Sequence, residues 1–200
     1  MARGHLIAFE GIDASGKSTQ ARRVAHSRHA RLTFEPGDTV LGAALRAIVL
    51  DAATPMSPET ASLLMLADRA HHVATVIEPE LAAGRHVVTD RFLASTLAYQ
   101  GYGAGVDLEL LRRATDLATG SCRPTVTFLL DVPIEVARAR RSMSGADRYE
   151  SAGDDFQDAV RRGYLELARE DVDTWVVLDG ERSPEDVAQF IDARLDALNI

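Results

Sequence analysis

Short apolar runs alternate with longer amphipathic segments along the chain. Five of these runs have the length of β-strands, and several are apolar at every position: residues 6–9, 31–34, 86–89, 126–130 and 175–178. Strands of that kind are buried on both faces, as in a parallel sheet covered by helices. The pattern therefore predicts an α/β fold, a five-stranded parallel sheet with helices on both faces, in a single domain over residues 1–200.

Helical periodicity fills the segments between the predicted strands. The predicted helices cover residues 17 to about 30, 40–50, 58 to about 82, 93–100, 107–118, 133–141, 154–170 and a last one from 184. Thr39, Ser57 and Ser183 are predicted N-caps, and the glycine-rich stretch 101–105 is predicted to stop the 93–100 helix. Two apolar helix sides are predicted to face the core: Leu41, Leu45, Ile48 and Val49 in one helix, and Val187, Phe190, Ile191, Leu195 and Leu198 in another.

Polar residues stand where the predicted strands end. In a parallel sheet the carboxyl ends of the strands meet at one edge, and ligands bind there. The strand-end residues predicted to converge on one cleft are Glu10, Glu35, Asp90, Arg91 and Asp131.

The residues that follow the first strand form the strongest motif. The stretch Gly11-Ile12-Asp13-Ala14-Ser15-Gly16-Lys17-Ser18-Thr19 fits G-x-x-x-x-G-K-[ST], the phosphate-binding P-loop. A chance match is the alternative, but a strand before the motif and a helix after it are the context that the motif needs. The sequence therefore predicts a P-loop NTPase fold with Lys17 at the terminal phosphates and Ser18 on Mg²⁺. Lys17 is also the only lysine in the chain.

Composition limits the classes of partner. The formal net charge of −8 argues against general nucleic-acid binding, which favours basic surfaces. Cys122 is the one cysteine, so no intrachain disulfide can form, and no apolar run has the length of a membrane span. The five residues before the first strand leave no room for a signal peptide. We therefore expect a cytoplasmic protein without membrane or nucleic-acid partners.

Three weaker constellations surround the P-loop. Asp90 can hold Mg²⁺ and Arg91 can clamp a phosphate, although a structural ion pair is the alternative.

Residues 142–146 form a small polar segment that predicts a mobile lid over about 140–150, although a solvated helix end is the alternative. Its flanking arginines are Arg138, Arg140, Arg141 and Arg148. Ser95, Thr96, Tyr99 and Gln100 share one helical face that suits a nucleobase, and Arg69 is ambiguous by itself.

These motifs together resemble the thymidylate (dTMP) kinase family of nucleoside-monophosphate kinases. The similarity covers nearly the whole chain and rests on five segments: Phe9–Gln20, Glu35–Thr39, Ala67–Arg69, Asp90–Gly101 and Asp147–Glu150. The segment Asp90-Arg91-Phe92-Leu93-Ala94-Ser95-Thr96-Leu97-Ala98-Tyr99-Gln100-Gly101 is the most specific, because it is similar to the family signature D-R-[YF]-x-x-S-x-x-A-Y-Q-G.

The resemblance implies the reaction ATP + dTMP → ADP + dTDP with Mg²⁺, in a homodimer built through helices next to the acceptor site. It implies that Asp13 contacts the sugar hydroxyl of dTMP and that Arg91 contacts its phosphate. Arg140 would lie over the donor adenine, and Arg148 would approach the transferred phosphoryl group. The residues implied to line the acceptor pocket are Glu35, Pro36, Met65, Arg69, Ser95, Thr96, Tyr99 and Gln100.

The chain departs from the family pattern at four positions. Phe34 replaces an Arg that many members have before E-P-G, so one acceptor-side cation is missing or comes from elsewhere. Asp38 replaces the second Gly of that segment, and Met65 stands where an aromatic residue commonly stacks on thymine. Ala14 occupies a position at which some members carry Arg.

Three other functions remain open at this point. The chain could be a P-loop kinase for another nucleotide, a P-loop switch or ATPase that acts on a partner protein, or a nucleotide-binding protein without catalysis. A panel of acceptors separates the first from a dTMP kinase, and hydrolysis without an acceptor would mark the second. Silence with every acceptor would mark the third.

Overall fold

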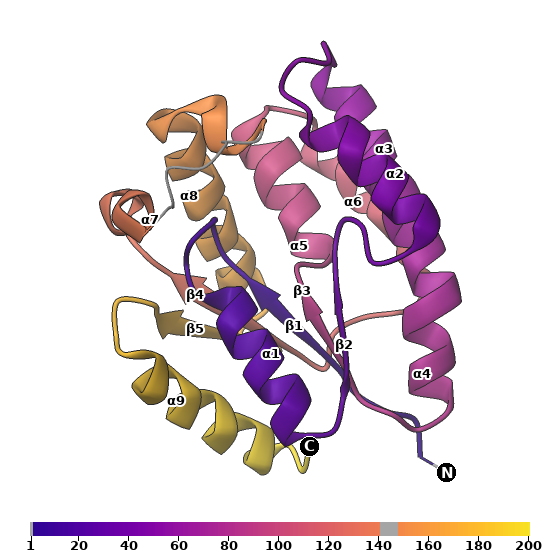
Figure 1. Ribbon diagram of the computed structural model, residues 1–200, viewed down its shortest axis with the longest axis vertical. Coiled ribbons are helices and arrows are strands. Elements are labelled where there is room, and N and C mark those ends of the chain that lie inside the picture. Colours follow the sequence, from indigo (N-terminus) through magenta and orange to yellow (C-terminus); the bar gives the residue numbers. More distant parts are fainter. Residues whose placement is uncertain (1, 141–147) are drawn as a thin grey trace.

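The computed structural model describes residues 2–140 and 148–200 (Figure 1). Its sheet has the strand order β2-β3-β1-β4-β5, and every neighbouring pair is parallel. The strands are β1 (Leu6–Glu10), β2 (Arg31–Phe34), β3 (Val87–Asp90), β4 (Val126–Asp131) and β5 (Trp175–Asp179). The predicted fold class is therefore confirmed, and each strand lies within one residue of its predicted limits at either end.

The helices connect successive strands and follow the predicted order. They are α1 (Lys17–Ser27), α2 (Val40–Leu50), α3 (Pro58–His72), α4 (Glu78–Ala82), α5 (Leu93–Thr96), α6 (Leu108–Thr119), α7 (Ile134–Arg140), α8 (Asp154–Glu170) and α9 (Pro184–Ala197). A π-helical turn, η1 (Val73–Ile77), joins α3 to α4, a second, η2 (Leu97–Gly103), continues α5, and a 3-10 turn, η3 (Glu150–Ala152), precedes α8. The three predicted N-caps are confirmed, because Thr39, Ser57 and Ser183 each accept a backbone N–H of the first helical turn.

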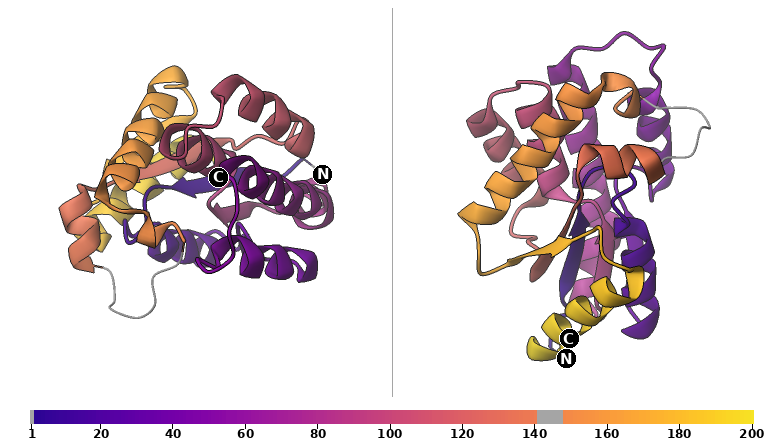
Figure 2. Two further views of the ribbon diagram at one scale, coloured as in Figure 1. Left: turned by 90° about the horizontal axis from the view of Figure 1, so that it is seen from above. Right: turned by 90° about the vertical axis from the view of Figure 1, so that its left-hand side faces the viewer.

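Both faces of the sheet are buried under helices, as the apolar strands require. Ile7 and Phe9 of β1 face one core together with residues of α1 and α9. Leu6 and Ala8, the alternate residues, face the opposite core with residues of η1 and α4. The right-hand view of Figure 2 shows α1 on one side of the sheet and α8 on the other. None of the helices in the described segments is long and apolar enough to cross a membrane.

The helix that follows β3 runs further than the sequence predicts. It continues as η2 through Gly103 instead of stopping before Gly101. A Cβ at Gly101 would lie 2.4 Å from the Leu108 side chain, and one at Gly103 would lie 2.7 Å from Phe156. These glycines therefore permit close packing of α6 and α8 on the helix, and they do not end it.

Two predicted apolar helix sides are partly wrong. Leu41 and Ile48 of α2 are exposed to about half, as is Phe190 of α9, while Val49 and Ile191 are buried. The guanidinium group of Arg182 lies 5.4 Å from the centre of the Phe190 ring and covers part of it. Periodicity identifies the helices here, but it does not show which apolar positions remain at the surface.

Asp131 does not join the cleft that the strand-end rule predicts. Its two carboxylate oxygens accept hydrogen bonds from Nε and Nη2 of Arg161, at 2.6 and 2.8 Å. This bidentate pair ties the end of β4 to α8, and Asp131 lines neither of the clefts that hold Glu35, Asp90 and Arg91.

Candidate active site

The loop between β1 and α1 closes through two glycines with positive φ. Gly11 has φ +141° and Gly16, which precedes α1, has φ +98°. A Cβ at Gly11 would lie 2.6 Å from Leu130 O, so the close approach of the loop to β4 requires glycine. Because the loop leads directly into a helix N-terminus, its backbone N–H groups and the helix dipole favour an anion such as phosphate.

Lys17 opens α1 and its side chain is buried against the loop. Its Nζ lies 3.4 Å from Ile12 O and 3.5 Å from Asp13 Oδ1, which are long distances for a charged hydrogen bond. Burial and the nearby Arg91 lower the pKa of Lys17, although Asp13 opposes that shift. The ammonium group thus has only weak contacts in the chain and can turn to a phosphate.

Arg91 lies just beyond β3 with its guanidinium group at the centre of the site. Its Nη2 donates to Asp13 Oδ1 at 2.6 Å and to Tyr99 OH at 3.0 Å, and its Nη1 lies 3.2 Å from Ser95 Oγ. Burial opposes ionisation of Asp13, but Arg91 and Lys17 outweigh it and hold the pKa of Asp13 well below its usual value. Asp13 is therefore a carboxylate, held between two cations at the edge of the P-loop.

The backbone at Arg91 adopts φ +70°, a left-handed conformation that costs a non-glycine residue about 1–3 kcal/mol. Glu10 stabilises the residues that follow. Its buried carboxylate accepts hydrogen bonds from Phe92 N at 2.9 Å, Ser95 Oγ at 2.6 Å and Tyr164 OH at 3.0 Å. Glu10 thus lies at the predicted edge of the sheet, but its side chain stabilises the start of α5. It does not line the cleft, although the sequence predicted that it would.

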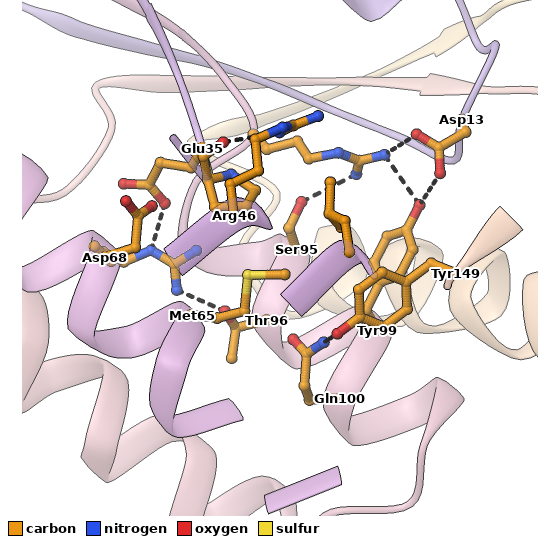
Figure 3. Close-up of a pocket in the computed structure, with 14 residues that line it drawn as sticks. Asp13, Glu35, Arg46, Met65, Asp68, Ser95, Thr96, Tyr99, Gln100 and Tyr149 are labelled. Carbon is orange, nitrogen blue, oxygen red and sulfur yellow. Dashed lines mark hydrogen bonds and ion pairs between the residues drawn. The ribbon is translucent and has the colours of Figure 1, made fainter. Parts of the chain in front are cut away.

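A pocket of about 580 Å³ lies between α2, α3 and the continuous helix formed by α5 and η2 (Figure 3). Ser95, Thr96, Tyr99 and Gln100 all line it, so the prediction that they share one helical face is confirmed. Every other residue predicted for the acceptor lines the same pocket: Asp13, Glu35, Pro36, Met65, Arg69 and Arg91.

A buried ion pair forms one end of this pocket. Arg69 Nε donates to Glu35 Oε2 at 2.7 Å, and His72 Nδ1 lies 2.9 Å from Glu35 Oε1. Burial opposes ionisation of Glu35, yet Arg69 and His72 outweigh it and lower its pKa. Arg69 also donates from Nη1 to Thr96 Oγ1 at 2.7 Å and from Nη2 to Phe92 O at 2.8 Å. Each Nη carries a second N–H, so two donors of Arg69 remain for a ligand.

Asp68 is a second buried acid on the pocket wall, next to Glu35 in Figure 3. The residue is 1% exposed, and neither carboxylate oxygen has a hydrogen-bond partner. Burial and the neighbouring Glu35 raise its pKa to about 6. A Cβ at Gly42 would lie 2.2 Å from Asp68 Oδ1, so the carboxyl group packs against the first turn of α2.

An arginine from α2 stands over Phe34, the residue that replaces the expected cation. The guanidinium carbon of Arg46 lies 5.9 Å from the centre of the Phe34 ring, and Nη1 donates to Pro36 O at 2.8 Å. Arg46 lines both the acceptor pocket and the adjoining phosphate cleft. Arg46 of α2, the helix that follows E-P-G, therefore supplies a cation on this side of the site.

The phosphate cleft, of about 720 Å³, opens between α1 and the ends of β2 and β3. It shares Asp13, Glu35, Arg46 and Arg91 with the acceptor pocket, and Lys17, Ser18 and Asp90 also line it. Asp90 Oδ1 is buried and has no hydrogen-bond partner. An orphaned carboxylate oxygen beside a serine hydroxyl fits Mg²⁺, which takes one or two protein oxygens and completes its shell with phosphate and water.

A third cleft, of about 700 Å³, lies on the other side of the P-loop. Its walls include Ala14, Ser15, Gly16 and Thr19 of the loop and Arg140 at the end of α7. Nη1 of Arg140 donates to Gly180 O at 2.8 Å, which ties the side chain to the segment between β5 and α9. Arg140, to which the resemblance assigns a contact with the donor adenine, thus lines the cleft beside the P-loop.

The resemblance implies that Arg148 approaches the transferred phosphoryl group, and the structure places its side chain at the end of α2. Its Nε donates to Val49 O at 2.9 Å and its Nη2 to Asp51 O at 2.7 Å, so the side chain caps the C-terminal end of α2. It lines neither the phosphate cleft nor the donor cleft. Arg138 pairs with Asp154. Arg141 and the predicted lid residues 142–146 lie outside the described residues.

Sequence reasoning overlooked several residues of the site. Arg46 could have been found from the sequence, because Phe34 replaces the arginine that many family members carry before E-P-G, and a nearby arginine could supply that charge instead. Tyr149 could also have been found, since it belongs to the segment that resembles the family lid; it lines the acceptor pocket, and Gln100 Nε2 donates to its hydroxyl at 3.0 Å. No sequence feature predicts the unpartnered Asp68 or the contact of Tyr164 with Glu10, because only the fold brings those groups together.

A P-loop beside a polar pocket, with one cationic cleft between them, defines a class of protein: a P-loop kinase that phosphorylates a small acceptor. A family model described as thymidylate kinase matches residues 9–191. The chain belongs to the thymidylate kinase family. It is therefore a dTMP kinase, which phosphorylates dTMP with ATP, and the other functions left open by the sequence are set aside.

Individual relatives agree with this assignment. A thymidylate kinase of Desulforudis audaxviator is 44% identical over 202 residues, which cover 98% of this chain and 91% of that protein. One of Desulfovibrio desulfuricans is 45% identical, over 91% of this chain and 90% of that protein. The crystal structure of thymidylate kinase from Ehrlichia chaffeensis superposes with a TM-score of 0.79 at 29% identity, over 96% of this chain and 99% of that one.

Proposed function

We propose that dTMP is phosphorylated at the junction of the acceptor pocket and the phosphate cleft, with ATP on the P-loop side. The observation that carries this proposal is the shared wall of the two spaces. Asp13, Arg46 and Arg91 line both, so a nucleotide with its base in the pocket directs its phosphate toward Lys17.

In the acceptor pocket, the base lies between the helices that carry Arg69 and Gln100. The two remaining N–H groups of Arg69 donate to a carbonyl oxygen of thymine, and the amide of Gln100 pairs with the edge of the ring. Met65 packs on the ring through its thioether, which adapts to an aromatic face without fixing its orientation. Asp13 accepts a hydrogen bond from the sugar hydroxyl.

Catalysis depends on alignment and charge neutralisation, because the acceptor phosphate oxygen is already a nucleophile. Arg91 and Arg46 hold the acceptor phosphate, while Lys17 turns from Ile12 O and Asp13 to the terminal phosphates of ATP. Ser18 and the orphaned oxygen of Asp90 would hold Mg²⁺, which would supply Lewis-acid neutralisation of phosphate charge. Asp13 holds the guanidinium group of Arg91 in place by accepting a hydrogen bond from its Nη2.

On the donor side, the segment from Gly11 to Thr19 binds the phosphates of ATP. Arg140 covers the adenine in the third cleft, where its contact with Gly180 O orients the guanidinium plane. Arg148 is assigned a positioning role, because its hydrogen bonds fix the end of α2, the helix that carries Arg46.

A homodimer through α2, α3 and α6 completes the proposal. Helices α2 and α3 pack side by side, and α6 packs on α3. Several large apolar side chains of these helices are exposed by roughly half or more: Leu41, Ile48, Leu63, Leu110 and Leu117. Apolar groups gathered on one helical layer favour association with a second copy. We further propose a cytoplasmic location, in keeping with a single, buried, unpaired cysteine.

Product analysis tests the assignment of the site. Incubation with ATP, Mg²⁺ and dTMP is expected to yield dTDP and ADP in equal amounts by chromatography, and Lys17→Ala is expected to abolish both products. Arg85→Ala is the matched control, because Arg85 is an exposed arginine paired with Glu80 at the opposite end of the sheet. Equal yields from Lys17→Ala and Arg85→Ala would refute the placement of ATP on the P-loop.

A further inference from the structure

A chain of hydrogen bonds leads away from the acceptor pocket, from Arg69 of α3 to Asp38 after β2. Glu35 joins the first two members, since it accepts from Arg69 Nε at 2.7 Å and its Oε1 lies 2.9 Å from His72 Nδ1. On the other side of the ring, Thr33 Oγ1 lies 2.6 Å from His72 Nε2 and 2.6 Å from Asp38 Oδ2. His72 is completely buried and Thr33 is 1% exposed. Of these five residues, the proposed function uses only Arg69.

The single proton of the Thr33 hydroxyl decides which way these bonds run. Asp38 Oδ2 also accepts from Arg31 Nη2 at 2.8 Å, so Asp38 is a carboxylate in an ion pair and can only accept. Thr33 therefore donates its proton to Asp38 and can only accept a hydrogen bond from His72. It follows that Nε2 of His72 carries a hydrogen.

The other ring nitrogen of His72 also faces a carboxylate. Burial opposes ionisation of Glu35, but the charge of Arg69 outweighs it and the pKa of Glu35 is lowered, so Glu35 can only accept from Nδ1. Both ring nitrogens thus carry hydrogen, which is the imidazolium form. Burial and Glu35 raise the pKa of Asp68, and the charge of His72 opposes that rise. The charged groups of this network come from β2, the segment after it and α3: Arg31, Glu35, Asp38, Asp68 and Arg69.

We propose that Asp38 keeps His72 doubly protonated through Thr33. The imidazolium holds Glu35 between two cations, and Glu35 in turn orients Arg69 toward the acceptor base. Asp38 is one of the positions at which this chain departs from the family pattern. With glycine at that position, Thr33 would be free to donate to His72, and the ring would be neutral. Asp38 and His72 are thus positioning residues, and their effect on the acceptor rests on the proposed function, which assigns Arg69 to the base.

Nitrogen-15 NMR of the six histidines reads the charge of His72 at pH 7.5 without any nucleotide. An imidazolium gives two ring nitrogens of similar chemical shift, a neutral ring separates them widely, and His72→Gln identifies the resonance. Wild type and Thr33→Ser, which keeps the hydroxyl, are expected to show the imidazolium. Asp38→Gly and Thr33→Val are expected to show a neutral ring with its hydrogen on Nδ1. Asp171→Gly is the matched control, because Asp171 is an exposed acid that also accepts a threonine hydroxyl. A neutral His72 in wild type, or an imidazolium in both Asp38→Gly and Thr33→Val, overturns the inference.

Steady-state kinetics test the effect on the acceptor. At pH 7.5, Asp38→Gly should raise the Michaelis constant for dTMP about fivefold, because a neutral donor holds Glu35 less firmly than a charged one. Both kcat and the Michaelis constant for ATP should stay within twofold, a separation that general loss of structure would not give. At pH 5.5, where an ordinary histidine takes up a proton, the difference from wild type should disappear. An unchanged Michaelis constant for dTMP beside a neutral ring would overturn the positioning role. Failure of the proposed function is distinguishable, because it would abolish dTDP formation and leave the NMR result as it is.

Discussion

Arg46→Ala is the most informative single substitution, because the assignment of Arg46 came from the structure alone. Its guanidinium group is positioned by Pro36 O at 2.8 Å and by the ring of Phe34 at 5.9 Å, so it is oriented before the acceptor binds. A hydrogen bond between an arginine and a phosphate contributes about 1.5–3 kcal/mol. At about 1.4 kcal/mol per factor of ten, kcat/KM for dTMP should fall roughly 10- to 150-fold.

Phe34→Ala should have a smaller effect of the same kind. It removes an exposed cation–π contact of about 0.5–1 kcal/mol, so kcat/KM for dTMP should fall roughly two- to fivefold. Steady-state rates of ADP release at varied dTMP measure both variants, with Arg85→Ala as the control. The Michaelis constant for ATP should not change. If Arg46→Ala retains kcat/KM for dTMP within twofold of wild type, Arg46 does not hold the acceptor phosphate.

Three further predictions concern the groups that support the site. Glu35→Gln leaves Arg69 buried without its carboxylate and should lower the free energy of unfolding by about 3 kcal/mol in urea; an unchanged midpoint would contradict the buried pair. The pKa of Asp68 in the folded protein, about 6, lies above that of an unfolded aspartate. The contribution of Asp68 to the free energy of unfolding is therefore fully present below about pH 4 and is lost as pH rises through 6. Asp68→Asn should therefore be more stable than wild type at pH 8, by up to about 3 kcal/mol, and equal to it at pH 4. Arg148→Ala should lower the melting temperature and raise the Michaelis constant for dTMP, whereas a fall in kcat alone would favour a role at the transferred phosphoryl group.

Much of this architecture could be predicted from local patterns. Short, mainly apolar runs identified the strands, and those apolar at every position, such as residues 6–9, indicated a strand buried on both faces. Cap residues such as Thr39 and Ser183 marked helix starts, because their side chains replace missing backbone partners. The P-loop and the 95–100 face were found because each is contiguous in the sequence: the loop follows a known motif, and the face follows from helix periodicity.

Other features depend on contacts between distant segments. Gly101 reads as a helix stop by itself, but Leu108 fills the space that a Cβ would need, and the helix continues. Asp131 ends a strand as Asp90 does, but it forms an ion pair with Arg161 of α8. Likewise, the cation that Phe34 lacks comes from Arg46, one turn before the end of the next helix. Periodicity does not contain such pairings, because they are set by tertiary packing.

The central claim is that the pocket lined by Arg69, Thr96 and Gln100 selects dTMP as phosphoryl acceptor. A coupled assay of ADP release with ATP and Mg²⁺, run with dTMP, dUMP, dCMP, dGMP, CMP, AMP and no acceptor, tests it most directly. The account predicts strong turnover with dTMP, weak turnover with dUMP and none without an acceptor. Equal turnover with dCMP or AMP, or hydrolysis of ATP without any acceptor, would contradict it.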